Sequence, residues 1–419
     1  MKNKPLAILS PLCLCLFAGS AWAELEPFSF GASENLQHQS NLGHNDAPVA
    51  DWVSTTELNA AINEPLGRDK LVATGAVDFN RYKRSHHLNS TGYQAGAVFD
   101  WNTVGDLSGA LGADSHRRQF FQGETADFSF GGLPPTTTLV RNMQTDNHAF
   151  INATLGAQAR WSIFGGADAN RRTFSQEAYR INDQRQWSTN LGTRISPSPD
   201  LSFGVTGNYV RGDYPQGGLV LTPSGVVPTQ SNFNSKSVSA TTRWQVSGNT
   251  RMDGSLGYTN YFSDSFGGTR HFMNGALNFA WTPPSHLTFN LALKRSADAD
   301  ATSAGITNNP QGANALNGTS INNSAHLEAV YAFTAKTSLN ASEDYTDRKY
   351  ENLITPVGVV SGTTRTQRFF LTAHFLPTRT TDVSCGVGRE TRHADESLRD
   401  LARSYNDNYV QCMAAIRFD

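Results

Sequence analysis

The stretch LVATGAVDFN, residues 71–80, changes character at every second position. Drawn as an extended chain, one face carries only apolar or small side chains: Leu71, Ala73, Gly75, Val77 and Phe79. The opposite face carries a more polar set: Val72, Thr74, Ala76, Asp78 and Asn80. Because successive side chains of a strand point to opposite faces, this period of two indicates a β-strand with one apolar face.

The same alternation recurs from about residue 52 to residue 418, in short segments joined alternately by very short turns and by long polar loops. After the first 23 residues, the chain has no unbroken apolar run of roughly 18 residues, the length at which a membrane-spanning helix becomes a candidate. Strands with one apolar face, repeated between short and long connections, are typical of a transmembrane β-barrel. The sequence therefore predicts an all-β fold.

Short turns are expected near residues 65–67, 103–105, 162–163, 197–199, 248–249, 283–285, 335–336 and 377–378. Gly, Pro, Asn and Ser supply the turn dihedrals at most of them. The clearest long loops are residues 122–144, 212–235, 299–320 and 351–364. This rhythm predicts a single antiparallel barrel of about 18 strands, with short periplasmic turns and long extracellular loops. A count of 16 is the alternative, because segments 27–38 and 51–64 alternate least regularly.

The start of the chain has the features of an export signal. A basic tetrapeptide, residues 1–4, precedes an apolar run and the tripeptide Ala21-Trp22-Ala23. This order predicts a secretory signal peptide over residues 1–23, so residues 24–419 would form the outer-membrane β-barrel. The formal net charge is −2, whereas a nucleic-acid-binding protein would carry a basic stripe, so no nucleic-acid partner is expected.

A soluble β-sandwich would also alternate, with its apolar face turned into a core. It would have to bury five tryptophans: Trp101, Trp161, Trp187, Trp244 and Trp281. Four of these five lie close to a predicted short turn. Aromatic girdles of membrane barrels lie at that level. The last segment, residues 409–418, resembles the C-terminal signal of proteins handled by the outer-membrane insertion machinery, although Asp419 follows Phe418. Both features favour the outer membrane of a Gram-negative bacterium.

Cys385 and Cys412 both fall on the predicted outward faces of the last two strands. The midpoint between them lies in the connecting loop, residues 393–404, so an antiparallel hairpin would place them almost opposite each other. Directly opposed Cβ atoms lie about 4.5–5.5 Å apart, and a bridge needs about 4 Å. We expect a structural disulfide in an oxidising compartment, the alternative being two small apolar residues that face lipid.

Seven basic residues share the predicted inward parity and are candidates for contact with a solute in the lumen: Arg160, Arg172, Arg194, Arg243, Arg251, Lys294 and Arg368. A cationic lumen would favour an anionic solute. Acidic residues also fall inward: Asp78, Asp168, Asp253, Asp344 and Glu390. The alternative is therefore a charge-balanced, hydrogen-bonded wall. Tyr82, Phe174 and Tyr261 are also expected inward, where aromatic faces could stack on sugar rings.

Sequence motifs of catalysis are absent. The chain contains no G-x-S-x-G, no H-E-x-x-H and no Cys/His cluster with metal-ligand spacing. We therefore expect no enzyme activity, no cofactor and no metal. A barrel-embedded enzyme stays open as an alternative, because a catalytic triad scattered over several strands leaves no local motif.

From residue 24 onward the chain resembles the outer-membrane β-barrels of the EpsL type, which are associated with exopolysaccharide biosynthesis and export. The resemblance rests on the Ala21-Trp22-Ala23 site with residues 27–36, on the strand count without an appended domain, and on residues 384–390 together with 409–418. It implies that a polysaccharide passes from the periplasm to the cell surface. The implied partners are polysaccharide synthesis and export proteins, beside outer-membrane lipids. A general diffusion porin for small anionic or sugar solutes is the other non-enzymatic hypothesis.

Overall fold

The computed structural model describes residues 28–44, 48–120, 139–222, 225–264, 268–298, 319–355, 358–398 and 404–418. The predicted signal peptide lies outside the described residues, and so do the greater parts of the predicted loops 122–144 and 299–320. Within the described ranges, no helix is long and apolar enough to cross a bilayer.

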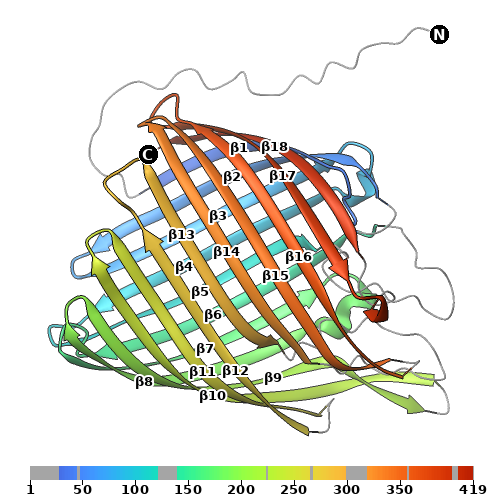
Figure 1. Cartoon of the computed structure of the whole chain (residues 1–419), viewed down its shortest axis with the longest axis horizontal. Coiled ribbons are helices and arrows are strands. Elements are labelled where there is room, and N and C mark those ends of the chain that lie inside the picture. Colours follow the sequence, from blue (N-terminus) through green and yellow to red (C-terminus); the bar gives the residue numbers. More distant parts are fainter. Residues whose placement is uncertain are drawn as a thin grey trace.

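Eighteen strands run through this described part of the chain (Figure 1). The first nine are β1 Phe28–Gln39, β2 Asp51–Leu66, β3 Asp69–Tyr82, β4 Ser90–Asn102, β5 Leu107–Phe120, β6 Asn142–Leu155, β7 Trp161–Phe174, β8 Gln184–Ser198 and β9 Leu201–Thr222. The second nine are β10 Gly225–Ser247, β11 Thr250–Ser263, β12 Gly268–Trp281, β13 Leu287–Asp298, β14 Thr319–Thr334, β15 Thr337–Thr355, β16 Gly358–Phe375, β17 Thr381–Ala394 and β18 Tyr405–Phe418. Short 3-10 helices are η1 His86–Leu88, η3 Glu177–Asn182 and η6 Glu396–Leu398.

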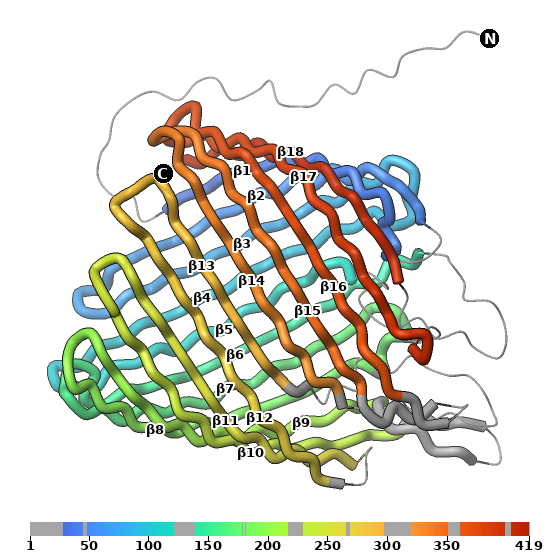
Figure 2. Tube along the Cα trace, in the orientation of Figure 1, coloured from blue at the N-terminus to red at the C-terminus, as the bar shows by residue number. Residues whose placement is uncertain are grey.

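The strands form one closed antiparallel barrel. Each strand pairs with the next along the chain, and β1 also pairs with β18, from Phe30 opposite Phe418 to Gln39 opposite Tyr409. Figures 1 and 2 show the resulting cylinder of tilted strands. The predicted fold and the count of 18 strands are confirmed, and the alternative count of 16 is excluded. The two least regular segments, β1 and β2, are held by ladders on both sides.

Eight tight turns gather at one end of the barrel, called here the short-turn end, where β1 also begins and β18 ends (left in Figure 1). Seven of them fall on or beside a predicted turn. The prediction at Ser162 and Ile163 is wrong, because these residues lie inside β7. The chain turns earlier, at residues 156–160, where Gly156 has a φ of 75°. Glycine adopts this left-handed region at no steric cost, so Gly156 was the true turn signal.

Two predicted loops are largely strand. Within residues 212–235, β9 continues to Thr222 and pairs there with Gly225, the first residue of β10. Within residues 351–364, Thr355 pairs with Gly358 in the same way. Glycine and proline favoured a loop in the sequence. However, the arms are also rich in Val, Leu and Thr, which favour strands, and a register shift between Thr229 and Ser231 adjusts the longer hairpin. The end that carries these hairpins is called here the hairpin end.

The outer surface carries large apolar side chains that are more than half exposed, among them Leu58, Leu191, Val205, Val238, Leu256 and Met273. Trp161, Trp244 and Trp281 lie beside short turns and are 61%, 46% and 39% exposed. Alternate apolar positions that face outward all around a closed barrel are stable when hydrocarbon surrounds them. Buried apolar clusters of the described residues lie instead toward the hairpin end, one of them formed by Leu42, Val53, Tyr82, Leu88 and Leu139.

Candidate functional site

The inner wall of the barrel consists of the strand positions that alternate with the exposed apolar ones. Six of the seven candidate basic residues occupy such positions: Arg172, Arg194, Arg243, Arg251, Lys294 and Arg368. Arg243, for example, directly precedes the outward-facing Trp244 on β10. The wall therefore presents these side chains to the lumen.

Arg160 is a correction to the sequence prediction. It is exposed in the turn at residues 156–160 and does not lie on a strand face. The error has the same origin as the misplaced turn, because the predicted strand was extended six residues too far along the chain, past Leu155 to Trp161. Side chains alternate between two faces only within a strand, so the turn residue Arg160 does not belong to the inner wall.

Cross-strand register links inward residues of neighbouring strands into rows. One of them, called here the charge row, crosses β10 to β18 through Arg243, Asp253, Asn278, Ala292, His326, Asp344, Arg368, Glu390 and Asp407. Arg243 lies near the short-turn end of β10, and Asp407 lies at the hairpin end of β18. Because barrel strands are tilted, a row perpendicular to them climbs along the axis. The charge row therefore passes from one end of the barrel toward the other.

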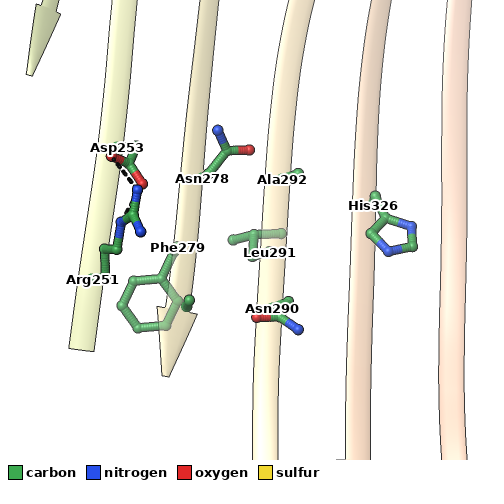
Figure 3. Close-up of a pocket in the computed structure, with 9 residues that line it drawn as sticks. Arg251, Asp253, Asn278, Phe279, Asn290, Leu291, Ala292 and His326 are labelled. Carbon is green, nitrogen blue, oxygen red and sulfur yellow. Dashed lines mark hydrogen bonds and ion pairs between the residues drawn. The ribbon is translucent and has the colours of Figure 1, made fainter. Parts of the chain in front are cut away.

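Near the short-turn end, two arginines share one carboxylate. Arg243 Nε lies 2.9 Å from Asp253 Oδ1, and Arg251 Nε lies 2.8 Å from Asp253 Oδ2. Figure 3 shows Arg251 and Asp253 in contact on β11, with Asn278, Asn290 and His326 on the neighbouring strands. Because two guanidinium groups face one carboxylate, this part of the wall carries a local positive excess.

Arg194 extends this positive region across β8. Its guanidinium carbon lies 5.3 Å from the centroid of the Phe164 ring, a cation–π arrangement. Arg194, Arg243 and Asp253 line a common cavity of about 310 Å³. Both arginines therefore face the same cavity, where they would attract an anion together.

Arg368 is held differently, by an aromatic neighbour. Its Nε donates a hydrogen bond of 2.7 Å to the Tyr409 hydroxyl, and its guanidinium carbon lies 5.2 Å from the same ring. Phe370 stacks on Tyr409 with centroids 5.3 Å apart. Asp344 and Glu390 flank Arg368 in the charge row. The guanidinium is thus fixed in place, with a carboxylate on each neighbouring strand.

The opposite wall repeats the mixture of signs. Asp146 on β6 is buried and accepts hydrogen bonds from Arg172 Nε at 2.8 Å and from Gln144 Nε2 at 2.5 Å. His116 Nε2 lies 3.2 Å from Asp146 Oδ2, the oxygen that also accepts the hydrogen bond from Gln144. Nearby, His148 Nδ1 lies 3.0 Å from Asp114 Oδ1. The wall is therefore better described as a balanced hydrogen-bonded surface with one cationic region than as a ring of a single sign.

Glu328 on β14 is a wall residue that sequence reasoning missed. It accepts hydrogen bonds from Asn290 Nδ2 at 3.0 Å and from Asn340 Nδ2 at 2.9 Å, so two amides hold its carboxylate. It shares its strand face with His326, which pairs with the correctly placed Asp344. The parity of residues 319–334 could have revealed it, because the alternation that placed Asp344 continues into that segment.

The aromatic residues expected to stack on sugars are covered. Tyr82, Phe174 and Tyr261 are only 4%, 7% and 9% exposed. Phe174 lies against Phe120 with centroids 5.3 Å apart, and Tyr261 stacks on Phe233 at 6.0 Å. These rings brace the hairpin end of the wall and present little free face to a solute.

The disulfide site is on the outside of the barrel. Cys385 on β17 and Cys412 on β18 are directly paired and joined by a disulfide, with Cα atoms 4.1 Å apart. Both side chains belong to the outward set with Val387 and Val410, which are 51% and 45% exposed. The bridge therefore staples the last hairpin and does not enter the lumen.

The described residues contain no group of three or more His, Cys, Asp or Glu that could hold a metal ion. Solved structures similar to this chain include two from Pseudomonas aeruginosa: the outer membrane protein OpdK (11% identity, TM-score 0.49, 93% of this chain and 99% of that chain) and OccK9, also called OpdG (11%, 0.48, 93% and 98%). A third is the FrpB iron transporter, F3-3 variant, from Neisseria meningitidis (10%, 0.44, 93% and 81%). No family model and no curated protein matches the sequence.

The location of the protein follows from its own architecture. A strand can cross hydrocarbon only when its backbone groups are paired within a closed ring, and this barrel closes through β1 and β18. Its exposed outward positions are mainly apolar, and its inward positions are mainly polar or charged. The chain is therefore a β-barrel of the Gram-negative outer membrane.

Proposed function

We propose that this barrel is a channel through which an exopolysaccharide leaves the periplasm for the cell surface. The observation that carries the proposal is the charge row, which crosses nine successive strands, β10 to β18, and offers a polar or charged side chain on each of them except β13, where Ala292 lies. Neighbouring strands lie about 4.8 Å apart, so a polymer that moves along the row loses one contact as it gains the next. Weak contacts at many sites permit entry and release alike.

The resemblance to EpsL-type barrels supports the same proposal and suggests its partners. Polysaccharide synthesis and export proteins would deliver the polymer at the periplasmic, short-turn end. There the arginines around Asp253 would attract acidic sugars. Arg368, Glu328 and the amides would act as neutral or balanced partners higher in the wall. The outer-membrane insertion machinery would assemble the barrel in the lipid.

A diffusion porin for small anions is the second candidate function, and one observation favours it. The cavity lined by Arg194 and Arg243 with Asp253 is a compact positive site, of a size that suits a small anionic solute. We propose no catalytic role, since the wall groups described above pair as ion pairs and amide–carboxylate contacts. The enzyme alternative would require hydrolysis by the purified protein that a single Ser or His substitution abolishes.

Conductance in planar bilayers tests the channel directly. We expect an acidic polysaccharide, added at the short-turn side, to block the current of the native protein. The double variant Arg243→Gln, Arg251→Gln should weaken this block roughly tenfold, because it removes two charged partners of the polymer. Arg160→Gln is the matched control, since Arg160 lies in a turn, and it should leave the block unchanged. A wide, unselective current that the polysaccharide does not reduce would contradict the proposal.

A deletion strain separates the two transport functions. Loss of surface polysaccharide with unchanged uptake of small solutes is expected for an export channel. Reduced uptake of small anions with normal surface polysaccharide would identify a diffusion porin instead.

A further inference from the structure

The wall of the barrel forks between β12 and β13. Their ladder has seven residue pairs, from Trp281 opposite Phe289 at the short-turn end to Gly275 opposite Arg295. Beyond that point β12 stays paired with β11 as far as Gly268. β13 stays paired with β14 as far as Asp298. Among the described residues, the two strands thus continue without pairing to each other, as the diverging ribbons in Figures 1 and 2 show.

A groove of about 470 Å³ lies at this fork. Its outward lining is apolar on the short-turn side, where Leu277 pairs with Leu293 and Ala325 follows on β14. Tyr345 closes the row on β15. Gly275 contributes no side chain, and a Cβ atom there would come no closer than 3.3 Å to the Ser255 carbonyl oxygen. The groove is therefore open toward the membrane and apolar on its short-turn side, as an acyl chain requires.

Two adjacent cations lie at the point of the fork. Arg295 is exposed on the outward parity, and Lys294 is exposed on the inward parity. Arg295 Nη1 donates a hydrogen bond of 3.1 Å to Asn323 Oδ1, which holds the guanidinium above the apolar part of the groove. The nearest carboxylate in this row, Asp347, lies 3.5 Å from Arg365 Nε on its other side. The fork therefore carries positive charge available to an anion.

The height of this charge matches a lipid headgroup. Arg295 lies eight residues along β13 from Leu287, the first residue after the short turn. At about 3.3 Å per residue and a tilt of about 40°, this places Arg295 roughly 20 Å above the short-turn end of the strand. The apolar band of a membrane barrel is about 25 Å tall. Arg295 is thus close to the outer interface, with the apolar groove below it in the outer leaflet.

We propose that the fork between β12 and β13 is a binding site for a phosphorylated glycolipid of the outer leaflet. One acyl chain lies along Leu277, Leu293 and Ala325, and a phosphate group lies against Arg295. Arginine binds phosphate oxygens through a fixed fork of N–H donors, which makes it the suitable residue at this level. The inference goes beyond the proposed channel activity and holds whether the solute is a polymer or a small anion.

The test measures lipid that stays with the protein. Protein extracted from outer membranes in a mild detergent is analysed by native mass spectrometry, and the folded state is checked by heat-dependent gel mobility. We expect about one lipopolysaccharide molecule on the native barrel, and roughly tenfold less on Arg295→Gln, because a charge-assisted hydrogen bond is lost. Arg389→Gln is the matched control, since Arg389 also faces outward, on β17, away from the fork, and it should retain the lipid.

A second variant keeps the charge and removes the groove. Gly275→Leu should fill the space for the acyl chain and lower retention by a comparable factor, with Arg295 intact. Equal retention by the native protein and by Arg295→Gln would overturn the proposal, and so would a native barrel that carries no lipid. Retention of ordinary phospholipid in place of lipopolysaccharide would also overturn it. The same purified barrels can be compared in phospholipid vesicles with and without added lipopolysaccharide, and only the vesicles that contain lipopolysaccharide should load the fork.

Discussion

The β17–β18 hairpin and the β12–β13 hairpin occupy the same wall, and both are antiparallel neighbours joined by backbone ladders. The β17–β18 ladder runs through twelve residue pairs, from Thr381 opposite Ile416 to Arg392 opposite Tyr405, and a disulfide crosses it. The β12–β13 ladder ends after seven pairs. Backbone pairing is equally available to any two neighbouring strands. We therefore look for the difference in the side chains, because β13 continues past Arg295 to Asp298 without pairing to β12.

Side chains on β17–β18 hold the two strands together on both faces. Outside, Cys385 and Cys412 are bridged; inside, the Tyr409 ring lies over Gly388 and is held by Arg368. The corresponding positions of the fork carry Gly275 and two adjacent cations, Lys294 and Arg295. Arg295 is opposite Gly275 and Lys294 is opposite Ala276, so neither cation has a large partner side chain across this end of the ladder. Cohesion of the wall is thus local, strong at the closing hairpin and weak at the fork.

Removal of the disulfide should have the largest effect on this contrast. In the double variant Cys385→Ala, Cys412→Ala, the free energy of unfolding should fall by about 3 kcal/mol. The bridge between residues 385 and 412 restricts the unfolded chain, and the variant loses this restriction. Urea unfolding in lipid vesicles, followed by tryptophan fluorescence, measures the change. Native protein with a reductant is the control and should show the same loss. An unchanged midpoint would mean that the ladder alone holds the hairpin.

Replacement of a glycine by leucine should change the free energy of unfolding at the closing hairpin more than at the fork, by a smaller amount than loss of the disulfide. A Cβ atom at Gly388 would lie 2.3 Å from the Tyr409 ring, so Gly388→Leu must displace that ring and should cost about 1–3 kcal/mol. Gly275→Leu meets nothing closer than 3.3 Å and should stay within about 0.5 kcal/mol of the native protein. The same unfolding experiment compares both variants. Similar losses for the two would erase the proposed difference in packing.

A bridge introduced below the fork should have the smallest effect. Leu277 and Leu293 are directly paired, so the double variant Leu277→Cys, Leu293→Cys can form a disulfide across the weak ladder. We expect a gain of about 1 kcal/mol, since engineered bridges deliver less than the chain-entropy model predicts. Hydrogen exchange of those amides in residues 271–274 that point away from β11, toward the fork, should slow under oxidising conditions only. Slow exchange of these amides in the native protein would show that the fork is already closed.

Most of the fold could be predicted from particular residues. Alternation such as that of residues 71–80, with turns at Gly67 and at Gly248-Asn249, predicted the strands and their order. The errors were local: a glycine turn at residue 156 was missed, and the hairpin arms within 212–235 and 351–364 were interpreted as loops. Glycine and proline indicate turns wherever they occur, whereas the partner that keeps a strand extended lies elsewhere in the chain.

The sequence could predict which residues of the candidate site face inward, but it could not predict the contacts between them. Alternation alone placed Arg243, Arg251 and Asp253 on one face. Their grouping around a single carboxylate depends on the register of β10 against β11, which no local pattern contains. The same limit applies to Glu328, whose two amide partners come from β13 and β15.

The amino-acid sequence by itself determined the period of two, the chemistry of most turns and the face on which each side chain lies, because these depend on neighbours along the chain. The two cysteines belong to this group, since their opposition follows from a single hairpin. Only the tertiary structure decided the closure of β1 on β18, the charge row and the fork at Gly275. These depend on pairing between distant residues, and the stagger accumulates around the whole ring before it closes.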